Sequence, residues 1–456
     1  MKVFDLQGNN TNFISEMLAG LTSFVTVSYL LVQCPAMIGG DSVAASTLYL
    51  AVCFTCFIGC MAMGFWARQP FVIGPSVGLT SYFAATLMTD MKYDYTEALA
   101  ITFFSAVIFV ILSLTGLTAK IYTSFSGNMK NGITAGLGIY ITMLGFKNAG
   151  FLTEGANGNW KITDLSVFNL QVFTVMVMFV GLILIGLFKK IGLIFPPVLG
   201  LIASGGLYFG LGKFLHLVDL SPPELKFGSI SGQLGTWYTE GFLKNLTVGM
   251  GGIFGGMKLE VKTVLAFVVT LLVCSLFNAT ESVGVVYAIA KTSGKLDDKG
   301  NFGSLKNTMA SNAVTTTVGT LLGCPMVSVM PESSAGISAQ GKSGLTAVTA
   351  GVLFLLAAFF APVATYIPSA VTACIMVYIG FSMIGAAKEI DFADIGDGVP
   401  ALMTMILIPF TSSIIDGIAF GVIVHIVASL CLFKFKSLNV LEIIIAVLFG
   451  LHYFYL

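Results

Sequence analysis

Charged side chains are scarce in this sequence. Aspartate, glutamate, lysine and arginine together make up 10% of its 456 residues, and histidine occurs 3 times. Soluble domains carry about a quarter charged residues, so this composition excludes a soluble globular class. The 22 basic and 22 acidic side chains balance, and no lysine- or arginine-rich run argues for a nucleic-acid partner. With 56% hydrophobic residues and a mean hydropathy of +0.93, the chain is typical of an integral membrane protein in a lipid bilayer.

Enzyme and metal-site motifs are also missing. The sequence has no His-Glu-x-x-His, no phosphate-binding loop and no Ser/His/Asp arrangement that can be placed in one site. Most of the 8 cysteines lie in apolar segments and are interpreted as small hydrophobic residues. Cys53, Cys56 and Cys60 have ligand-like spacing, but no histidine or carboxylate accompanies them. We therefore predict no enzyme activity, no metal and no cofactor. The N-terminus has no cleavable signal pattern, so the first apolar segment is expected to stay as a membrane helix.

Long apolar windows divide the chain into two sets of seven. A helix that crosses the bilayer needs about 20 apolar residues. The windows lie at 13–38, 44–66, 77–90, 96–115, 131–150, 168–188 and 191–211, and then at 263–290, 307–323, 332–342, 344–366, 369–386, 398–414 and 416–433. With a cytoplasmic N-terminus, most lysines and arginines of the short loops fall on the cytoplasmic side. The sequence predicts an all-α polytopic protein of the plasma membrane with fourteen spans, and a further apolar stretch follows at 438–455.

The third span of each set is too short to cross the bilayer. The segments that begin at Val77 and Glu332 each follow an extended run with turn-forming residues, at 69–75 and 323–331. Because seven is odd, the second set would be inserted upside down, which gives two inverted seven-span repeats. Half-helices at spans 3 and 10, each preceded by a short strand, would then meet near the midplane with their free N–H groups converging. This arrangement predicts a transporter-type binding site.

Two glutamates lie in nearly charge-free segments of this predicted site. Glu281 belongs to the eighth span and Glu332 begins the second half-helix. Carboxylates at membrane depth are costly and usually bind substrate or protons. The alternatives are a structural acid paired with a buried lysine or backbone donor for Glu281, and an ordinary helix N-terminal acid for Glu332. We predict that both glutamates are functional.

Small polar residues near these acids are further candidates. Ser76 is a hydroxyl donor at the start of the first half-helix, and Thr80 lies one turn further on. Asn278 lies three residues before Glu281 and would share its helix face. An interhelical hydrogen bond is as good an interpretation of Asn278 as substrate contact.

Short segments spread over nearly the whole chain match the motifs of a known family. They are Glu16 to Thr22, Cys34-Pro35, Gly78 to Ala84, Leu114 to Leu117, Gly145 to Gly150, Glu332 to Gly336, Gly344 to Thr346 and Pro409 to Gly421. By these segments the chain resembles the nucleobase:cation symporter-2 superfamily, most closely its azaguanine-type purine permease branch, which carries adenine, guanine and hypoxanthine. The region from Gly323 to Gly421 is the most specific part of the likeness.

The resemblance implies a core domain, a gate domain and a homodimer. The core would comprise spans 1–4 and 8–11 at 13–115 and 263–366, the gate spans 5–7 and 12–14 at 116–212 and 367–433, with an extracellular connection at 213–262 and a C-terminal tail at 434–456. In the family, acids of the eighth and tenth spans hold the base, and they correspond to Glu281 and Glu332. The backbone entering the first half-helix corresponds to Ser76 and Val77. The full set of predicted substrate-binding residues is Glu281, Glu332, Ser76, Val77, Thr80, Asn278 and Ser333.

We expect proton-coupled import of a purine nucleobase by alternating access, with Glu281 as the proton-coupling residue and Glu332 as the substrate clamp. One alternative is a uracil- or xanthine-type symporter, because the run from Thr280 to Gly284 is closer to those branches. Another is a sulfate-permease-like anion transporter of the same architecture, which would favour a basic residue at the half-helix ends. Na⁺ in place of H⁺ stays open, since carboxylates and backbone carbonyls suit both ions.

Overall fold

The computed structural model describes residues 4–38, 45–154, 160–193, 196–217, 248–252, 261–297, 302–360, 368–411, 414–434, 438–440, 442–444, 446–447 and 450. Most of the predicted connection at 213–262 and the end of the C-terminal tail therefore lie outside the described residues. Within the described part, four helices are long and apolar enough to cross a membrane: Thr47–Ala67, Tyr95–Leu114, Leu170–Ile191 and Phe267–Lys291.

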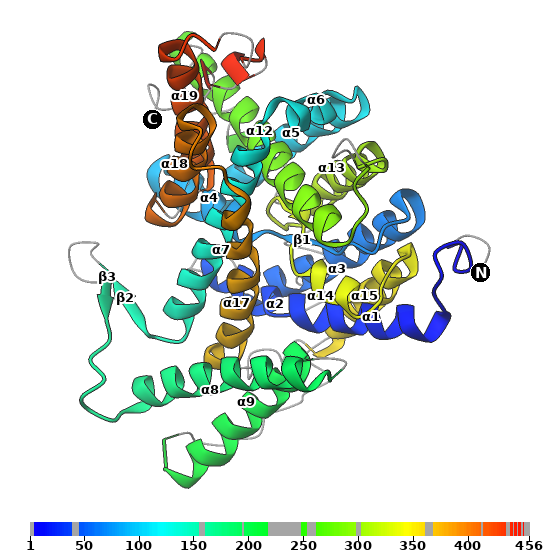
Figure 1. Cartoon of the computed structure of the whole chain (residues 1–456), viewed down its shortest axis with the longest axis vertical. Coiled ribbons are helices and arrows are strands. Elements are labelled where there is room, and N and C mark those ends of the chain that lie inside the picture. The colour runs from blue at the N-terminus through cyan, green and yellow to red at the C-terminus, as the bar shows by residue number, and fades with distance from the viewer. Residues whose placement is uncertain are drawn as a thin grey trace. The chain divides into compact units, whose positions relative to one another are not determined.

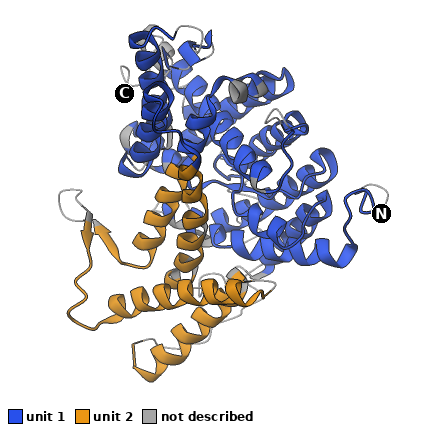
Figure 2. Ribbon diagram, in the orientation of Figure 1, with its two compact units in different colours: residues 1–133, 227–361, 389–456 blue, residues 134–226, 362–388 orange. Residues whose placement is uncertain are grey.

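The chain divides into two compact units (Figure 2). Unit 1 comprises residues 1–133, 227–361 and 389–456, and unit 2 comprises 134–226 and 362–388. Unit 1 thus groups the last two apolar helices with both predicted core segments. The core and gate boundaries expected from the sequence stay a prediction.

Unit 1 consists mainly of helices, several of which end or bend within an apolar segment. From the N-terminus they are α1 (Phe13–Val27), α2 (Leu30–Ile38), α3 (Ala45–Ala62) with the π-helical η1 (Met63–Ala67), α4 (Val77–Tyr82) with the π-helical η2 (Phe83–Asp90), α5 (Tyr95–Leu114), α6 (Leu117–Ser124) and the start of α7 (Gly127–Asn148). The second half contributes α12 (Val261–Thr292), α13 (Leu305–Leu321), α14 (Ser333–Ser338), α15 (Gly344–Ala357) with the short η4 (Ala358–Phe360), α18 (Ile395–Thr411) and α19 (Ile414–Cys431).

A two-stranded antiparallel ribbon joins the two halves of unit 1. Strand β1 (Ile73–Pro75) pairs with β4 (Val327–Val329), with Ile73 opposite Val329 and Pro75 opposite Val327. All six residues are buried. The half-helix α4 follows β1 after one residue, and α14 follows β4 after three. The two half-helices with preceding strands, expected from the turn-forming residues and the short apolar windows, are therefore present.

Close helix packing surrounds this ribbon. Helix α1 packs against α15 and α14, and the three lie together in Figure 1. At the crossing of η1 with α15, a Cβ built on Gly344 would lie 2.2 Å from the backbone oxygen of Gly64. Only glycine lets the two backbones approach so closely.

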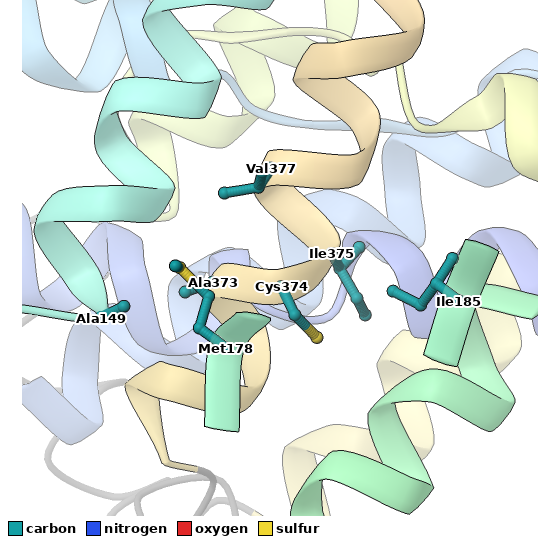
Figure 3. Packing of buried hydrophobic residues seen from close by; sticks show 7 residues of the cluster. All are labelled: Ala149, Met178, Ile185, Ala373, Cys374, Ile375 and Val377. Carbon is teal, nitrogen blue, oxygen red and sulfur yellow. The ribbon is translucent and has the colours of Figure 1, made fainter. Parts of the chain in front are cut away.

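Unit 2 is built around the contact of three helices. It holds the rest of α7, the paired strands β2 (Leu152–Glu154) and β3 (Trp160–Ile162), α8 (Leu170–Ile191), α9 (Pro196–Phe214), α17 (Ser369–Ile384) and the short η5 (Gly385–Glu389) up to residue 388. Helices α8, α9 and α17 pack on one another. Figure 3 shows the buried cluster in which side chains of α8 and α17 meet Ala149, the residue after α7: Ala149, Met178, Ile185, Ala373, Cys374, Ile375 and Val377.

Some predicted spans match single helices closely, and others do not. The windows at 96–115 and 369–386 correspond to α5 and α17. The first window, 13–38, was expected as one helix, but it breaks at Ser28 and Tyr29 into α1 and α2. The β2–β3 pair was not predicted, because its strands are only three residues long and too short to show a pattern.

Candidate functional site at the β1–β4 ribbon

Glu332 lies at the start of the half-helix α14. Pro331 precedes it and Ser333 begins the helix, so the carboxylate sits where the positive end of the helix favours an acid. Its side chain is 1% exposed. The hydroxyl of Tyr29, in the break between α1 and α2, donates a hydrogen bond of 2.6 Å to its Oε1 atom. A buried carboxylate is thus held by a hydroxyl from the other half of the chain.

Glu281 has a matching environment on α12, which packs against β4 and α14. Its side chain is 2% exposed, and the hydroxyl of Ser76 donates to its Oε1 atom. Ser76 is the residue between β1 and α4, so the ribbon fixes its position. The structure therefore brings Ser76 and Glu281 into direct contact, as their membership of one predicted site requires.

In the part of the chain that the structure describes, one carboxylate oxygen of each acid has no hydrogen-bond partner. Among the described residues, the Oε2 atoms of Glu281 and Glu332 and the hydroxyl oxygen of Thr80 are buried and make no hydrogen bond. Leaving a buried acceptor unpaired costs about 1–3 kcal/mol, and more for a charged group. These atoms are suited to accept N–H groups of a ligand.

The other predicted residues have different surroundings. Asn278 donates to the hydroxyl of Thr316 (3.4 Å) and accepts from Ser282 (3.2 Å), within a network between α12 and α13 that also contains Asn312 and Ser328. The hydroxyl of Ser333 accepts the N–H of Val72 at 2.9 Å. Val77 begins α4 beside Ser76. The roles assigned to Asn278, Ser333 and Val77 stay predictions.

A third buried acid, Glu16 of α1, shows the contrasting structural pattern. Its carboxylate accepts the N–H groups of Lys342 (3.0 Å) and Ser343 (3.2 Å) and the hydroxyl of Thr346. It therefore caps the start of α15 with both oxygens engaged. In the described part of the chain, no group of three or more His, Cys, Asp or Glu side chains is arranged so that it could hold a metal ion.

Tyr29 is the contact that the sequence interpretation missed. It belongs to the run from Phe24 to Leu31, which reads as an ordinary apolar helix without glycine or proline. An intramembrane tyrosine beside a serine is a weak signal, since both residues are common in helix packing. Tyr29 lies in the turn between α1 and α2, from which its hydroxyl reaches Glu332.

Comparison with known proteins supplies the family. The sequence matches the model of the Permease family over residues 14–420. It is 26% identical to the adenine permease AdeQ of Escherichia coli (strain K12), over 99% of this chain and 95% of that protein. It is also 26% identical to the guanine/hypoxanthine permease PbuO of Bacillus subtilis (strain 168), over 100% of both chains.

The fold has solved counterparts as well. It is similar to the transmembrane domain of a cyanobacterium bicarbonate transporter, BicA, with a TM-score of 0.58 over 90% of this chain and 97% of that one. At 14% identity this likeness concerns the fold alone. The family match over most of the sequence, together with the permease relatives, confirms the resemblance noted from the motifs. The chain therefore belongs to the Permease family and is a multi-pass membrane transporter, not an enzyme.

Proposed function

We propose that this protein imports a purine nucleobase by proton symport with alternating access. The observation that carries the proposal is the pair of buried acids, Glu281 and Glu332, each held through Oε1 by a hydroxyl and each with Oε2 unpaired among the described residues. The names of the adenine and guanine/hypoxanthine permeases, which align along nearly the whole chain, support a purine as the substrate.

The chemistry of a purine fits these groups. A planar purine presents N–H donors beside nitrogen or carbonyl acceptors on its edges, and an ionised carboxylate only accepts. Two carboxylate oxygens can take N–H groups, while the N–H groups of the first turn of α4, which have no partner inside their helix, can meet the acceptors. The polar groups on the edges of the base would then form hydrogen bonds with the protein instead of lying unpaired at membrane depth.

Proton coupling follows from the burial of the same acids. A site with ionised carboxylates at membrane depth is expensive to move across the bilayer. Protonation of Glu281 from outside would neutralise one of them and permit the loaded site to reorient, and release inside would complete the cycle. Glu332 would remain the clamp for the base. Two inverted seven-span repeats, fourteen spans in all, would supply the two faces between which the site alternates.

An anion transporter is the weaker alternative. Its support is the likeness of fold to a bicarbonate transporter, and function does not follow from fold. Two carboxylates, one at the start of α14 and one beside the start of α4, would repel an anion and offset the attraction of the helix ends. A uracil- or xanthine-type substrate is kept as an outcome of the test.

The test is uptake of labelled hypoxanthine into membrane vesicles, in competition with unlabelled adenine, guanine, xanthine, uracil and bicarbonate. We expect the unlabelled purines to reduce uptake of labelled hypoxanthine. We also expect a protonophore to abolish its accumulation. Preferential competition by uracil or by bicarbonate would support one of the alternatives instead.

Glu281→Gln tests the coupling role within the same assay. We expect this variant to exchange labelled base across the membrane without accumulating it, because the amide cannot carry the proton. Glu389→Gln is the matched control, since that carboxylate is about half exposed and pairs with Lys291. Accumulation by Glu281→Gln against a gradient would refute the coupling role.

A further inference from the structure

Tyr29 is a buried side chain of the candidate site to which proton symport assigns no role. It is 4% exposed and lies 303 residues from Glu332 in the sequence, yet its hydroxyl donates to the Oε1 atom of that acid. At 2.6 Å the contact is in the range of hydrogen bonds in which one partner is ionised. Such bonds are about twice as strong as bonds between neutral groups.

Hydrogen bonds on both sides hold the backbone around Tyr29 in place. The N–H of Leu31 donates to the carbonyl of Ser28 at 3.1 Å, and the N–H of Gln33 donates to the carbonyl of Tyr29 at 2.9 Å. The hydroxyl of Ser28 donates back to Val25 at 2.8 Å. The turn between α1 and α2 is therefore bonded on both sides, and Tyr29 acts as a fixed donor.

A fixed donor on one oxygen decides what the other oxygen can do. Because Oε1 accepts the hydrogen bond from Tyr29, rotation of the Glu332 carboxylate is restricted. The Oε2 atom therefore stays in one position. In the described part of the structure Oε2 is buried and has no hydrogen-bond partner. An ionised carboxylate oxygen in this state can accept a hydrogen bond and cannot donate one.

We propose that Tyr29 is a positioning residue that holds Glu332 as an acceptor toward the substrate and makes the site select bases with an N–H at that point. This inference rests on the proposed function, because it requires a nucleobase to bind at Glu332. A base methylated at that nitrogen loses the hydrogen bond and leaves a buried charged acceptor unpaired. Sites built around such acceptors discriminate strongly against ligands that lack the donor.

The experiment measures discrimination as well as affinity. Hypoxanthine, and hypoxanthine methylated in turn at each nitrogen that bears hydrogen, compete for uptake of labelled hypoxanthine by the parent chain and by Tyr29→Phe. One methylated base is expected to bind at least about tenfold more weakly to the parent chain. In Tyr29→Phe, KM for hypoxanthine should rise about tenfold and this discrimination should shrink, with the maximal rate largely kept.

Tyr49→Phe is the matched control. Tyr49 is also a buried tyrosine of unit 1, but its hydroxyl donates to the backbone oxygen of Ala357 at 3.0 Å and does not touch either site acid. It should keep the discrimination of the parent chain. The double variant Tyr29→Phe with Glu332→Gln should be no worse in KM than Glu332→Gln alone, because Tyr29 acts through Glu332.

Three results would overturn the inference: unchanged discrimination in Tyr29→Phe, the same loss in Tyr49→Phe, or full additivity in the double variant. A parent chain that transports bicarbonate and no nucleobase would overturn the proposed function as well, so the two failures are distinguishable. If Tyr29→Phe does not fold, 3-fluorotyrosine placed at position 29 serves instead. It keeps the ring and strengthens the donor, and KM should change there but not with 3-fluorotyrosine at position 49.

Discussion

Three of the buried glutamates of unit 1, Glu16, Glu281 and Glu332, differ in how many hydrogen-bond donors their carboxylate oxygens receive. Glu16 receives donors on both carboxylate oxygens from the start of α15, and nothing about it requires a ligand. Glu281 and Glu332 receive one hydroxyl each and leave one oxygen unpaired within the described residues. All three side chains are acidic and buried, so only the count of donors shows that Glu16 is a helix cap.

Ser76 provides the first prediction at this scale. Ser76→Ala removes the donor to Glu281, and we expect KM for the base to rise about tenfold, because hydrogen bonds to charged groups contribute about 1.5–3 kcal/mol. Uptake kinetics in vesicles measure it. Thr102→Val is the control, since that buried hydroxyl donates to Leu99 within its own helix α5. An unchanged KM in Ser76→Ala would show that its hydroxyl does not order the site.

Lys295 gives a pH-dependent prediction outside the membrane-spanning helices. Its ammonium donates to Gln69 (2.9 Å) and to the backbone oxygen of Lys342 (3.2 Å). Burial lowers the pKa of Lys295 to about 8, against a weaker opposing effect of Glu16. The unfolded chain, with an ordinary lysine pKa of about 10.4, binds more protons between these values. The free energy of unfolding should therefore rise with pH from about 8 to 10.4, by on the order of 3 kcal/mol.

Thermal unfolding in detergent across this pH range measures the effect. Lys295→Met should remove the rise, because the titrating group is gone. Lys306→Met, at an exposed position near the start of α13, should keep the behaviour of the parent chain. The assignment is wrong if the Lys295→Met protein still gains stability with pH as the parent does.

At the residue scale, sequence reasoning locates the acids better than their partners. Glu281 and Glu332 stand out because a carboxylate in an apolar segment is rare, and Ser76 follows from its place at the start of a half-helix. Tyr29 has no such signal, since its partner Glu332 lies 303 residues away in the sequence. Asn278 shares a helix with Glu281, but its amide bonds toward α13, which spacing on one helix cannot reveal.

At the scale of elements, the broken helices are predictable and the smaller deviations are not. Proline and glycine next to short apolar windows indicate both half-helices, and β1 and β4 occupy the extended runs before them. The break between α1 and α2 contains Ser28 and Tyr29, whose side chains leave a helix possible. At this break the hydroxyl of Tyr29 bonds to Glu332, 303 residues away, and local sequence does not contain such a long-range contact.

The C-terminal tail supplies the prediction at this scale. Glu442 is fully buried and lies 3.3 Å from Nδ1 of His425 on α19, while Nε2 of His425 lies 3.2 Å from Asp397 at the start of α18. This three-membered group ties the tail to two apolar helices. Glu442→Gln should lower the free energy of unfolding by on the order of 2 kcal/mol, because breaking a buried pair leaves its partner poorly compensated.

Thermal unfolding in detergent compares Glu442→Gln with Glu389→Gln. The latter breaks an exposed pair with Lys291, and such surface pairs contribute about 0–1 kcal/mol. Equal shifts in the two variants would contradict an anchoring role for Glu442. A larger shift in Glu442→Gln would explain why an apolar stretch beyond the predicted spans belongs to the fold.

At the scale of the whole molecule, composition and apolar windows predict a polytopic membrane protein, and the family match confirms the transporter class. The division into units is less accessible, because α18 and α19 associate with unit 1 through contacts far apart in sequence. The predicted homodimer, the core and gate boundaries and the fourteen-span count stay predictions.

The coupling ion is the last prediction, and it concerns the whole transport cycle. If one proton enters with each neutral base, net positive charge moves inward, and the membrane potential contributes about 2.3 kcal/mol per 100 mV. An inside-negative potential of about 100 mV should then drive about fiftyfold accumulation of hypoxanthine without any Na⁺. Vesicles with a potassium diffusion potential measure this directly. Because the proton is assigned to Glu281, the potential should drive no accumulation in Glu281→Gln. Accumulation that requires a Na⁺ gradient and survives a protonophore would instead assign the two carboxylates to sodium.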